Sequence, residues 1–313
     1  MRGALDEIGD SLAARLPARV RREVSSAELT TYRCGGPLAV FVRAEQEDDL
    51  RMVAEVLAGT PAGADVPLLV VGRGSNLLVS DRGFAGVAVA LAGELEQLDI
   101  DRRSARVRAG GGLALPVLAR RAAAVGVAGL EFYVGIPGSV GGAVRMNAGG
   151  HGAQTDDVIV TARVIDLGEG RTRELSRAEL GLGYRCSALT ARAVVVGATF
   201  SGRGDEPAAC AARIDEIVRW RREHQPGGQN AGSVFTNPPG DAAGRLVEAS
   251  GCKGLRVGGA VVSEKHANFF VAEPGAAAAD VYALVGSVQR RVEEASGVHL
   301  EPELRFVGFG GDG

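Results

Sequence analysis

A glycine-rich stretch from Gly129 to Gly152, GLEFYVGIPGSVGGAVRMNAGGHG, carries the strongest chemical signal in this sequence. Eight of its residues are glycine, about one in three, against 46 of 313 in the whole chain. Glycine lacks a Cβ and tolerates positive φ, so the backbone can approach a ligand closely, and Pro137 stiffens the run. Such a loop can aim several backbone N–H groups at an anion, most often a phosphate. We therefore expect a phosphate-bearing ligand; the alternative is a tight turn between strands.

A second glycine loop, Gly72-Arg73-Gly74-Ser75-Asn76, follows the apolar run Pro67–Val71. Its position after a predicted strand suggests the fingerprint of a dinucleotide-binding Rossmann fold. The third glycine of that fingerprint is absent, because Leu77 stands in its place. The sequence therefore predicts a phosphate-binding loop without a Rossmann domain.

Composition excludes several function classes. The net charge is −3 and no Lys/Arg stripe is interleaved with aromatic residues, so no nucleic-acid partner is expected. The N-terminal segment carries acids and arginines throughout, which excludes a signal peptide and a membrane span. Four scattered cysteines without a CxxC pair indicate a reducing, cytoplasmic setting. Four isolated histidines predict no metal, and nothing in the sequence points to a protein partner.

The basic residues are unusually biased toward arginine. Of 35 basic residues only Lys253 and Lys265 are lysine, and both fall within one short segment. An ammonium and a guanidinium are not interchangeable at a binding site, so these lysines are candidates for a specific contact.

Hydrophobic periodicity predicts a mixed α+β chain with many short strands, divided near residues 202–207. Residues 1–24 are predicted to be a helical or frayed N-terminal tail, residues 25–203 a first domain of two α+β lobes, and residues 204–313 a smaller α/β domain. Helices are predicted over 45–57, 113–125, 208–222, 242–249 and 277–295. Strands are predicted over 67–71, 87–91, 105–109, 158–165, 193–200, 269–272 and 303–307, with a further β-like run from Thr30 that is broken at Gly35-Gly36-Pro37.

Eight short motifs, in order, resemble those of the UDP-N-acetylenolpyruvoylglucosamine reductase family, also called UDP-N-acetylmuramate dehydrogenase. The resemblance covers residues 29–308, and the order of the eight motifs makes it specific. The motifs are TTYRCGGP (30–37), VGRGSNLLVSDRGFAG (71–86), GLEFYVGIPGSVGGAVRMNAGGHG (129–152), LGYRCS (182–187), GSVFTNP (232–238), GCKG (251–254), SEKHANFF (263–270) and LEPELRFVG (300–308).

The resemblance implies an FAD-binding domain of the vanillyl-alcohol-oxidase (PCMH) type, followed by a substrate-binding domain. It implies NADPH-dependent reduction of UDP-N-acetylglucosamine enolpyruvate to UDP-N-acetylmuramic acid, a step of peptidoglycan and cell-wall synthesis. NADPH would pass a hydride to non-covalent FAD, which passes it to C3 of the substrate before C2 is protonated. The FAD pyrophosphate would be held by two groups of residues: Gly72, Arg73, Gly74, Ser75, Asn76 and Leu77, and Gly135, Ile136, Pro137, Gly138, Ser139, Gly141, Gly142 and Ala143.

The family's catalytic residues fall on Arg185, Ser233 and Glu303. An always-charged guanidinium suits an enolate-like carboxylate, a hydroxyl held over C2 can deliver a proton, and a protonated carboxyl can assist. From the residues alone, simpler readings stay open: a structural ion pair for Arg185, a turn or N-cap residue for Ser233, and an edge-strand carboxylate for Glu303.

Substrate or NADPH contacts are expected from Asn237, Lys253, His266 and Asn268. The chain departs from the family at Gly150-His151, where Ala-Tyr is usual, and at Leu182, where an aromatic is usual. It also resembles the class that lacks a tyrosine-bearing loop closing over substrate. Two other functions remain as alternatives: an FAD-dependent oxidase of the same fold acting on a sugar or alcohol, and a catalytically silent UDP-sugar-binding protein.

Overall fold

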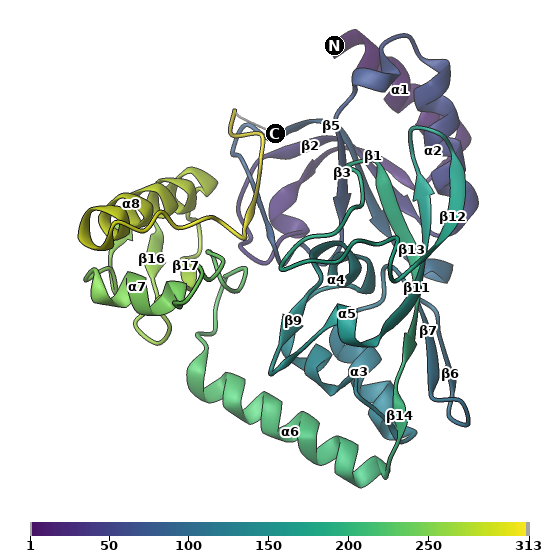
Figure 1. The fold of residues 1–313 in the computed structure, drawn as a ribbon. Coiled ribbons are helices and arrows are strands. Elements are labelled where there is room, and N and C mark those ends of the chain that lie inside the picture. Colours follow the sequence, from purple (N-terminus) through teal and green to yellow (C-terminus); the bar gives the residue numbers. More distant parts are fainter. Residues whose placement is uncertain (1, 311–313) are drawn as a thin grey trace. The chain divides into compact units, whose positions relative to one another are not determined.

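A computed structural model describes residues 2–310 of the chain (Figure 1). The chain divides into two compact units, each assembled from three stretches of sequence. Unit 1 comprises residues 1–23, 39–73 and 85–220, and unit 2 comprises residues 24–38, 74–84 and 221–313.

The first sheet has the strand order β1-β2-β5-β3. Strands β3 and β5 run parallel, with Leu68 opposite Val87. Helices α1 and α2 pack against each other beside this sheet (Figure 1). The elements are α1 (Arg2–Arg15), β1 (Val20–Ser25), β2 (Pro37–Ala44), α2 (Glu47–Gly59), η2 (Gly63–Asp65), β3 (Leu68–Val71) and β5 (Phe84–Leu91).

The predicted N-terminal tail is folded into unit 1. Leu5, Ile8, Leu12 and Leu16 are buried in the same core as the apolar face of α2. These four residues recur every three or four positions, the spacing that places them on one helical face. The segment is helical, as one of the two alternatives had it, but it is a packed part of unit 1 and not a separate tail.

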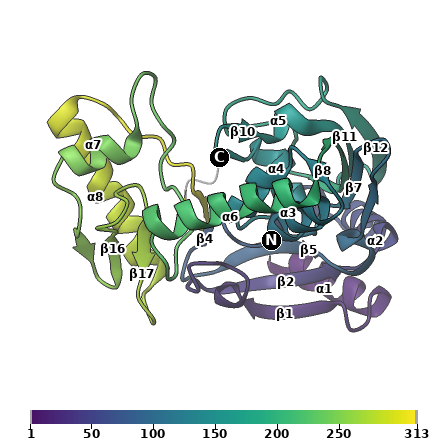
Figure 2. The same ribbon diagram turned by 90° about the horizontal axis from the view of Figure 1, so that it is seen from below.

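The second sheet of unit 1 is antiparallel throughout, in the order β12-β11-β13-β7-β6. Its core includes apolar residues of α3 and α4. Figure 2 shows these two helices beside the strands of the sheet. The elements are η3 (Gly93–Glu96), β6 (Leu98–Asp101), β7 (Arg106–Gly110), α3 (Leu115–Ala124), β8 (Val127–Ala128), η4 (Glu131–Gly135), α4 (Val140–Met146), β9 (Gly149–Gly150), β10 (Ala153–Gln154), α5 (Thr155–Val158), β11 (Ile159–Asp166), β12 (Arg171–Ser176), β13 (Ala193–Ser201), β14 (Arg203–Gly204) and α6 (Pro207–His224).

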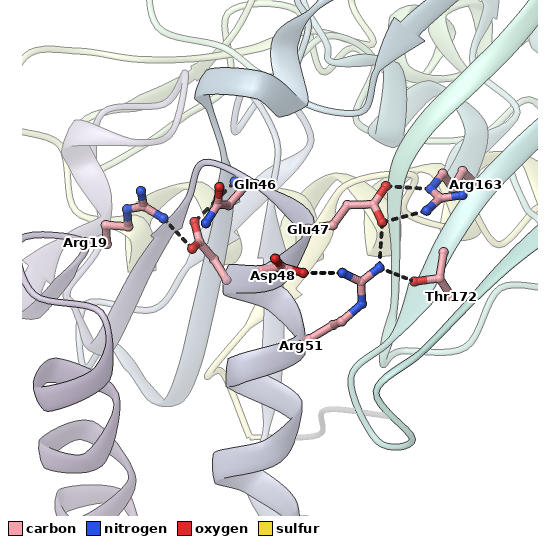
Figure 3. Close-up of polar contacts among 8 residues, drawn as sticks. Arg19, Gln46, Glu47, Asp48, Arg51, Arg163 and Thr172 are labelled. Atoms are coloured by element: carbon pink, nitrogen blue, oxygen red, sulfur yellow. Dashed lines mark hydrogen bonds and ion pairs between the residues drawn. The ribbon is translucent and has the colours of Figure 1, made fainter.

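Ion pairs connect α2 to the second sheet. Arg163 on β11 makes a bidentate contact with Glu47 at the start of α2, with Nε–Oε1 and Nη2–Oε2 distances of 2.5 and 2.9 Å. Arg51, one turn along α2, contacts Glu47 at 3.0 Å and Thr172 of β12 at 3.3 Å (Figure 3). These contacts join α2 to neighbouring strands β11 and β12.

Unit 2 contains a three-stranded sheet, β15-β16-β17, with α7 and α8 on one side of it (Figure 2). A separate parallel pair joins β18 to β4, with Arg305 opposite Leu77. One continuous core contains buried residues of β4, β16, β17, α7 and α8. The elements of unit 2 are η1 (Ser26–Glu28), β4 (Leu77–Val79), α7 (Ala243–Ala249), β15 (Arg256–Val257), β16 (Ala260–Val262), β17 (Phe270–Ala272), α8 (Ala278–Ser296) and β18 (Arg305–Val307).

The predicted helices occur close to their expected bounds, and the second glycine loop leads into strand β4, which confirms that no Rossmann helix follows it. The expected β-like run from Thr30 is wrong at its start. Residues 30–33 form a turn closed by the Arg33 N–H and the Thr30 carbonyl at 3.2 Å, and β2 begins at Pro37. Glu303 lies just before the final strand, which begins at Arg305.

The division of the chain also differs from the predicted border at residues 203 and 204. The units meet in sequence between Trp220 and Arg221, inside α6. The first part of α6 belongs to unit 1 because Cys210 and Ile214 are buried in its core. Arg213 adds an ion pair of 2.8 Å to the buried carboxylate of Glu131. A local change of composition does not reveal such long-range packing.

Candidate functional site

The second glycine loop begins in unit 1, where Gly72 contacts the stretch from Gly129 to Gly152. A Cβ added at Gly72 would lie 2.5 Å from the Oγ of Ser139, closer than real atoms approach. Ser139 is the N-cap of α4, and its Oγ accepts the N–H of Gly142 at 3.3 Å. Glycine at position 72 lets its backbone lie directly against the side chain of Ser139.

The backbone N–H groups of residues 140–143, the second half of the loop of residues 135–143, are already used within the protein. Val140 donates to the carbonyl of Leu113 at 2.9 Å, and Gly141 donates to that of Gly111 at 2.7 Å. Gly142 bonds to Ser139 Oγ, and Ala143 donates to the Ser139 carbonyl at 2.9 Å. Gly141, Gly142 and Ala143 therefore shape the loop instead of offering N–H groups to a ligand.

In the first half of this loop, residues 135–139, some backbone N–H groups have no acceptor within the described residues of the protein. Among residues 2–310, no protein acceptor takes the N–H of Gly138 or Ser139. Ile136 donates to the carbonyl of Tyr133 at 3.1 Å, while Pro137 is exposed and has no N–H to donate. Gly135 lies under the ring of His151, which would be 3.0 Å from an added Cβ. The N–H groups that this loop can offer to a phosphate are thus those of Gly138 and Ser139.

The rest of the second glycine loop, Gly74 to Asn76, lies in unit 2 and presents successive backbone N–H groups. Gly74 is buried with φ +63°, and an added Cβ would lie 1.9 Å from the carbonyl oxygen of Leu29. Within the part of the chain that the structure describes, the N–H groups of Gly74, Ser75 and Asn76 donate to no protein acceptor. Successive free N–H groups beside a left-handed residue bind anions. The loop therefore fits a phosphate group, and Leu77 after it begins strand β4.

Arg185 occupies a strained turn in unit 1. Its φ of 58° is left-handed, a conformation that costs a residue with a Cβ about 1–2 kcal/mol. Paired backbone bonds between Gly183 and Cys186 close the turn. The guanidinium donates from Nη2 to the carbonyl of Gly149 at 3.3 Å and lies 5.1 Å from the ring centre of Tyr184. Such strain at a charged residue is typical of a functional position.

Asn147 holds this turn and was not predicted. It is buried, ends α4 in the left-handed conformation, and donates from Nδ2 to the carbonyl of Gly183 at 2.9 Å. Its Oδ1 accepts the N–H of Asp156 at 2.9 Å. Asparagine is, after glycine, a frequent left-handed residue at helix ends, so Asn147 after the helical run could have been recognised from sequence.

Ser233 and Glu303 lie on neighbouring backbone segments of unit 2. Ser233 forms an antiparallel bridge with Phe269, and the next residue, Val234, accepts the N–H of Glu303 at 2.8 Å. The carbonyl of Glu303 accepts the Nδ2 of Asn76 at 3.1 Å. The structure thus brings together two of the three predicted catalytic residues within one unit, while Arg185 belongs to the other.

The four predicted substrate contacts also lie in unit 2, and two of them have structural tasks. Asn268 is buried, with its Nδ2 donating to the carbonyl of Phe235 at 2.8 Å and its Oδ1 accepting the Phe235 N–H at 3.0 Å. Asn237 accepts the N–H of Ala243 at the start of α7 at 3.0 Å. These amides therefore fix the backbone that follows Ser233.

Lys253 and His266 remain suited to a ligand. Lys253 is half-buried and pairs with Glu248 at 2.7 Å. His266 is half-buried, and burial lowers the pKa of its imidazole. Its Nδ1 accepts the N–H of Asn268 at 3.2 Å, so the ring is held in the neutral form that this bond requires.

His151 stands where the family usually has tyrosine, and its ring contacts the ring of Trp220. Its imidazole lies edge-on to Trp220 at a centroid distance of 5.0 Å. Since the same ring also covers Gly135, it packs directly against the glycine loop of unit 1.

The chain is similar to known proteins over most of its length. Residues 37–176 match the family model described as "FAD binding domain", and residues 224–307 match "UDP-N-acetylenolpyruvoylglucosamine reductase, C-terminal domain". The enzyme named UDP-N-acetylenolpyruvoylglucosamine reductase in Paramagnetospirillum magneticum is 42% identical over 296 residues, 94% of each chain. The chain belongs to the UDP-N-acetylenolpyruvoylglucosamine reductase family.

Further relatives agree. The reductase of Heliobacterium modesticaldum is 44% identical over 285 residues, covering 90% of this chain and 88% of that protein. The crystal structure of UDP-N-acetylenolpyruvylglucosamine reductase from Thermus caldophilus matches with a TM-score of 0.79 at 36% identity, covering 92% of this chain and 99% of that one. The predicted fold class, an α+β chain with an FAD-binding domain and a smaller C-terminal domain, is confirmed.

FAD is therefore the cofactor of this reductase, and the residues present fit it. Each unit taken by itself has backbone N–H groups of the kind that phosphate oxygens accept from: those of Gly74–Asn76 in unit 2, and those of Gly138 and Ser139 in unit 1. Between residues 2 and 310 no helix combines the length and apolar character needed to cross a membrane. The same residues contain no group of three or more His, Cys, Asp or Glu placed to hold a metal ion.

Replacing Gly74 by alanine should weaken FAD binding at least tenfold. The new Cβ meets the Leu29 carbonyl oxygen at 1.9 Å, and the left-handed φ adds about 1–2 kcal/mol of strain, so the loop must move. FAD titration followed by flavin fluorescence measures the effect. Gly59→Ala is the matched control: an added Cβ there has no neighbour within 4 Å, and alanine should leave FAD affinity unchanged. Equal FAD affinity in Gly74→Ala and wild type would contradict the assignment of this loop.

Proposed function

We propose that this chain catalyses the NADPH-dependent, FAD-mediated reduction of UDP-N-acetylglucosamine enolpyruvate to UDP-N-acetylmuramic acid. The near-full-length identity of 42% to a named reductase carries the proposal. All three predicted catalytic residues are present. Their retention argues against a catalytically silent UDP-sugar-binding protein. Bound FAD supplies the relay that accepts a hydride from NADPH and delivers it to the enolpyruvyl carbon.

The residues of the chain have separate tasks in this proposal. The Arg185 guanidinium, pre-set in a strained turn, stabilises negative charge that develops on the substrate carboxylate. Ser233 donates the proton to C2 of the substrate, and Glu303, on the adjacent backbone segment, assists as an acid near the enolate. Backbone donors of the glycine loops hold the cofactor, so these side chains act on the substrate alone.

We also propose which part of the chain binds FAD and which part binds the substrate. We assign FAD binding mainly to residues 25–203 and substrate binding to residues 204–313, the latter including Glu303 before the last strand. The matches to an FAD-binding model over 37–176 and to the reductase C-terminal model over 224–307 support this assignment.

Two half-reactions test the function. Purified protein should carry a yellow flavin that NADPH bleaches, and the enolpyruvyl substrate should restore the colour without oxygen. An oxidase of the same fold would instead consume NADPH or another donor with oxygen and ignore the enolpyruvyl compound. Flavin that is re-oxidised by oxygen but never by the enolpyruvyl substrate would exclude the proposed reaction.

We also place the reaction in the cytoplasm, as a step of peptidoglycan synthesis that supports cell-wall formation, growth and division. The substrate and NADPH are charged and nucleotide-linked, which suits an interior compartment. All four cysteines are free thiols in the described residues, as in a reducing environment. Loss of cell-wall synthesis on depletion of the protein, with accumulation of the enolpyruvyl nucleotide, is the expected phenotype.

Replacing Lys253 by alanine should raise the apparent KM for the UDP-linked substrate or for NADPH, with little change in kcat. A charged hydrogen bond contributes about 1.5–3 kcal/mol, which corresponds to a KM increase of about tenfold or more. Steady-state kinetics with each ligand varied in turn measures it. Arg256→Ala removes an equal charge from an exposed pair with Glu273 in the same unit and should leave both KM values unchanged. Unchanged KM values in Lys253→Ala would count against a ligand contact.

A further inference from the structure

We propose that Asn76 is a positioning residue for Glu303 and that its side-chain amide, in a loop assigned to FAD, serves the acid instead of the cofactor. The Nδ2 of Asn76 donates to the backbone carbonyl of Glu303 at 3.1 Å, across 227 positions of sequence. The carbonyl of Asn76 accepts the N–H of Arg305 at 3.1 Å. One residue thus bonds to the chain on both sides of Leu304. The inference rests on the acid role proposed above for Glu303.

The strand pair beside Glu303 is too short to hold that residue by itself. Strands β4 and β18 pair over three residues each, and their register starts at Leu77 opposite Arg305. Glu303 lies two residues before this ladder, where a short strand end frays unless other bonds hold it. Its N–H is held by Val234, the neighbour of Ser233, at 2.8 Å. Asn76 holds its carbonyl, so both polar groups of the Glu303 backbone are fixed.

The backbone and the side chain of Asn76 therefore have different tasks. Within residues 2–310 its N–H has no protein acceptor, which leaves it for the cofactor, whereas its amide nitrogen bonds to Glu303. A substitution at position 76 keeps the N–H and removes only the amide. This separates the two tasks experimentally, because cofactor affinity and placement of the acid should respond differently.

The test compares Asn76→Ala and Asn76→Asp with wild-type holoenzyme. Asn76→Ala, which keeps the backbone N–H and adds no charge, should bind FAD within about threefold of wild type by fluorescence titration and should be bleached by NADPH at the wild-type rate. Flavin re-oxidation by the enolpyruvyl substrate should slow about 10- to 100-fold, since displacement of a reacting group by about 1 Å costs up to 10²-fold. Asn76→Asp keeps the shape of the side chain but its ionised carboxylate cannot donate, so it tests the donor if the alanine variant folds poorly.

The pH profile of re-oxidation separates positioning from general damage. A displaced acid should shift the apparent pKa of re-oxidation in the Asn76 variants, whereas a simple loss of stability lowers the rate equally at each pH. An unshifted profile with a uniformly lower rate would overturn the proposal. So would weakened FAD binding combined with normal re-oxidation at saturating FAD, because Asn76 would then be a cofactor residue only.

A double-mutant cycle with Glu303→Gln distinguishes this proposal from the role of Glu303 itself. If Asn76 acts through Glu303, adding Asn76→Ala to Glu303→Gln should slow re-oxidation by less than twofold further. Multiplication of the two single effects would overturn the positioning role while leaving the acid role intact. Normal re-oxidation in Glu303→Gln alone would remove the acid role, and the positioning role with it.

Discussion

Replacing Ser233 by alanine is expected to give a flavoprotein that NADPH reduces normally but that the enolpyruvyl substrate re-oxidises very slowly. Hydride transfer to flavin does not need the hydroxyl, whereas protonation of the enolate does. A positioned general acid contributes about 10²–10⁴-fold, or roughly 3–5 kcal/mol of barrier. Stopped-flow absorbance of the flavin measures each half-reaction separately.

The control for this variant is Ser250→Ala. Ser250 is in the same unit, and its hydroxyl only donates to the carbonyl of Leu246 at the end of α7, at 2.9 Å. Both half-reactions should keep wild-type rates in that variant. If Ser233→Ala slows flavin reduction as much as re-oxidation, Ser233 shapes the site and is not the donor. If neither half-reaction slows, Glu303 becomes the first candidate for the donor.

Replacing Arg185 by lysine should reduce kcat about 10²–10³-fold even though the charge is kept. The guanidinium is a planar fork that can hold a carboxylate with two bonds, and an ammonium cannot reproduce that geometry. Lysine also loses the Nη2 bond to the carbonyl of Gly149, which orients the side chain in its left-handed turn. Re-oxidation of flavin should carry the whole loss, and reduction by NADPH should be unaffected.

Arg163→Lys provides the matched control for this change. Arg163 also makes a bidentate contact, with Glu47, but on an exposed part of the second sheet (Figure 3). Its replacement should leave kcat unchanged and lower stability by at most about 1 kcal/mol, the usual range for exposed pairs. Near-normal turnover in Arg185→Lys would assign Arg185 a structural role in the turn between Gly183 and Cys186.

Local patterns in the sequence were sufficient for the main helices and for the family. The apolar spacing of α2 and α8 predicted those helices because periodicity is a property of neighbouring residues. The density of glycine marked two loops where the backbone is closely packed, because positive φ and close backbone approach restrict which residues can stand there. The ordered motifs identified the family, and with it FAD and the reaction.

Only the tertiary structure shows which backbone N–H groups of the glycine loops are left to bind a ligand. The loop from Gly135 to Ala143 reads as a uniform row of donors, but Leu113 and Gly111 occupy the N–H groups of Val140 and Gly141, which leaves Gly138 and Ser139. Asn268 was expected to contact a ligand. In the structure its side-chain amide bonds to the backbone N–H and carbonyl of Phe235.

Local sequence patterns also could not predict the division of the chain or the contacts of single side chains, because both depend on residues far apart in sequence. The bond from Asn76 to Glu303 joins residues 227 positions apart, and unit 2 collects three separate stretches of sequence. Propensity and spacing report on residues within a few turns of helix or strand. Whether a backbone group or an amide is free depends on which distant segment packs beside it. The sequence by itself therefore determined the elements, the cofactor class and the residue types of the site, and folding decided which of them face a ligand.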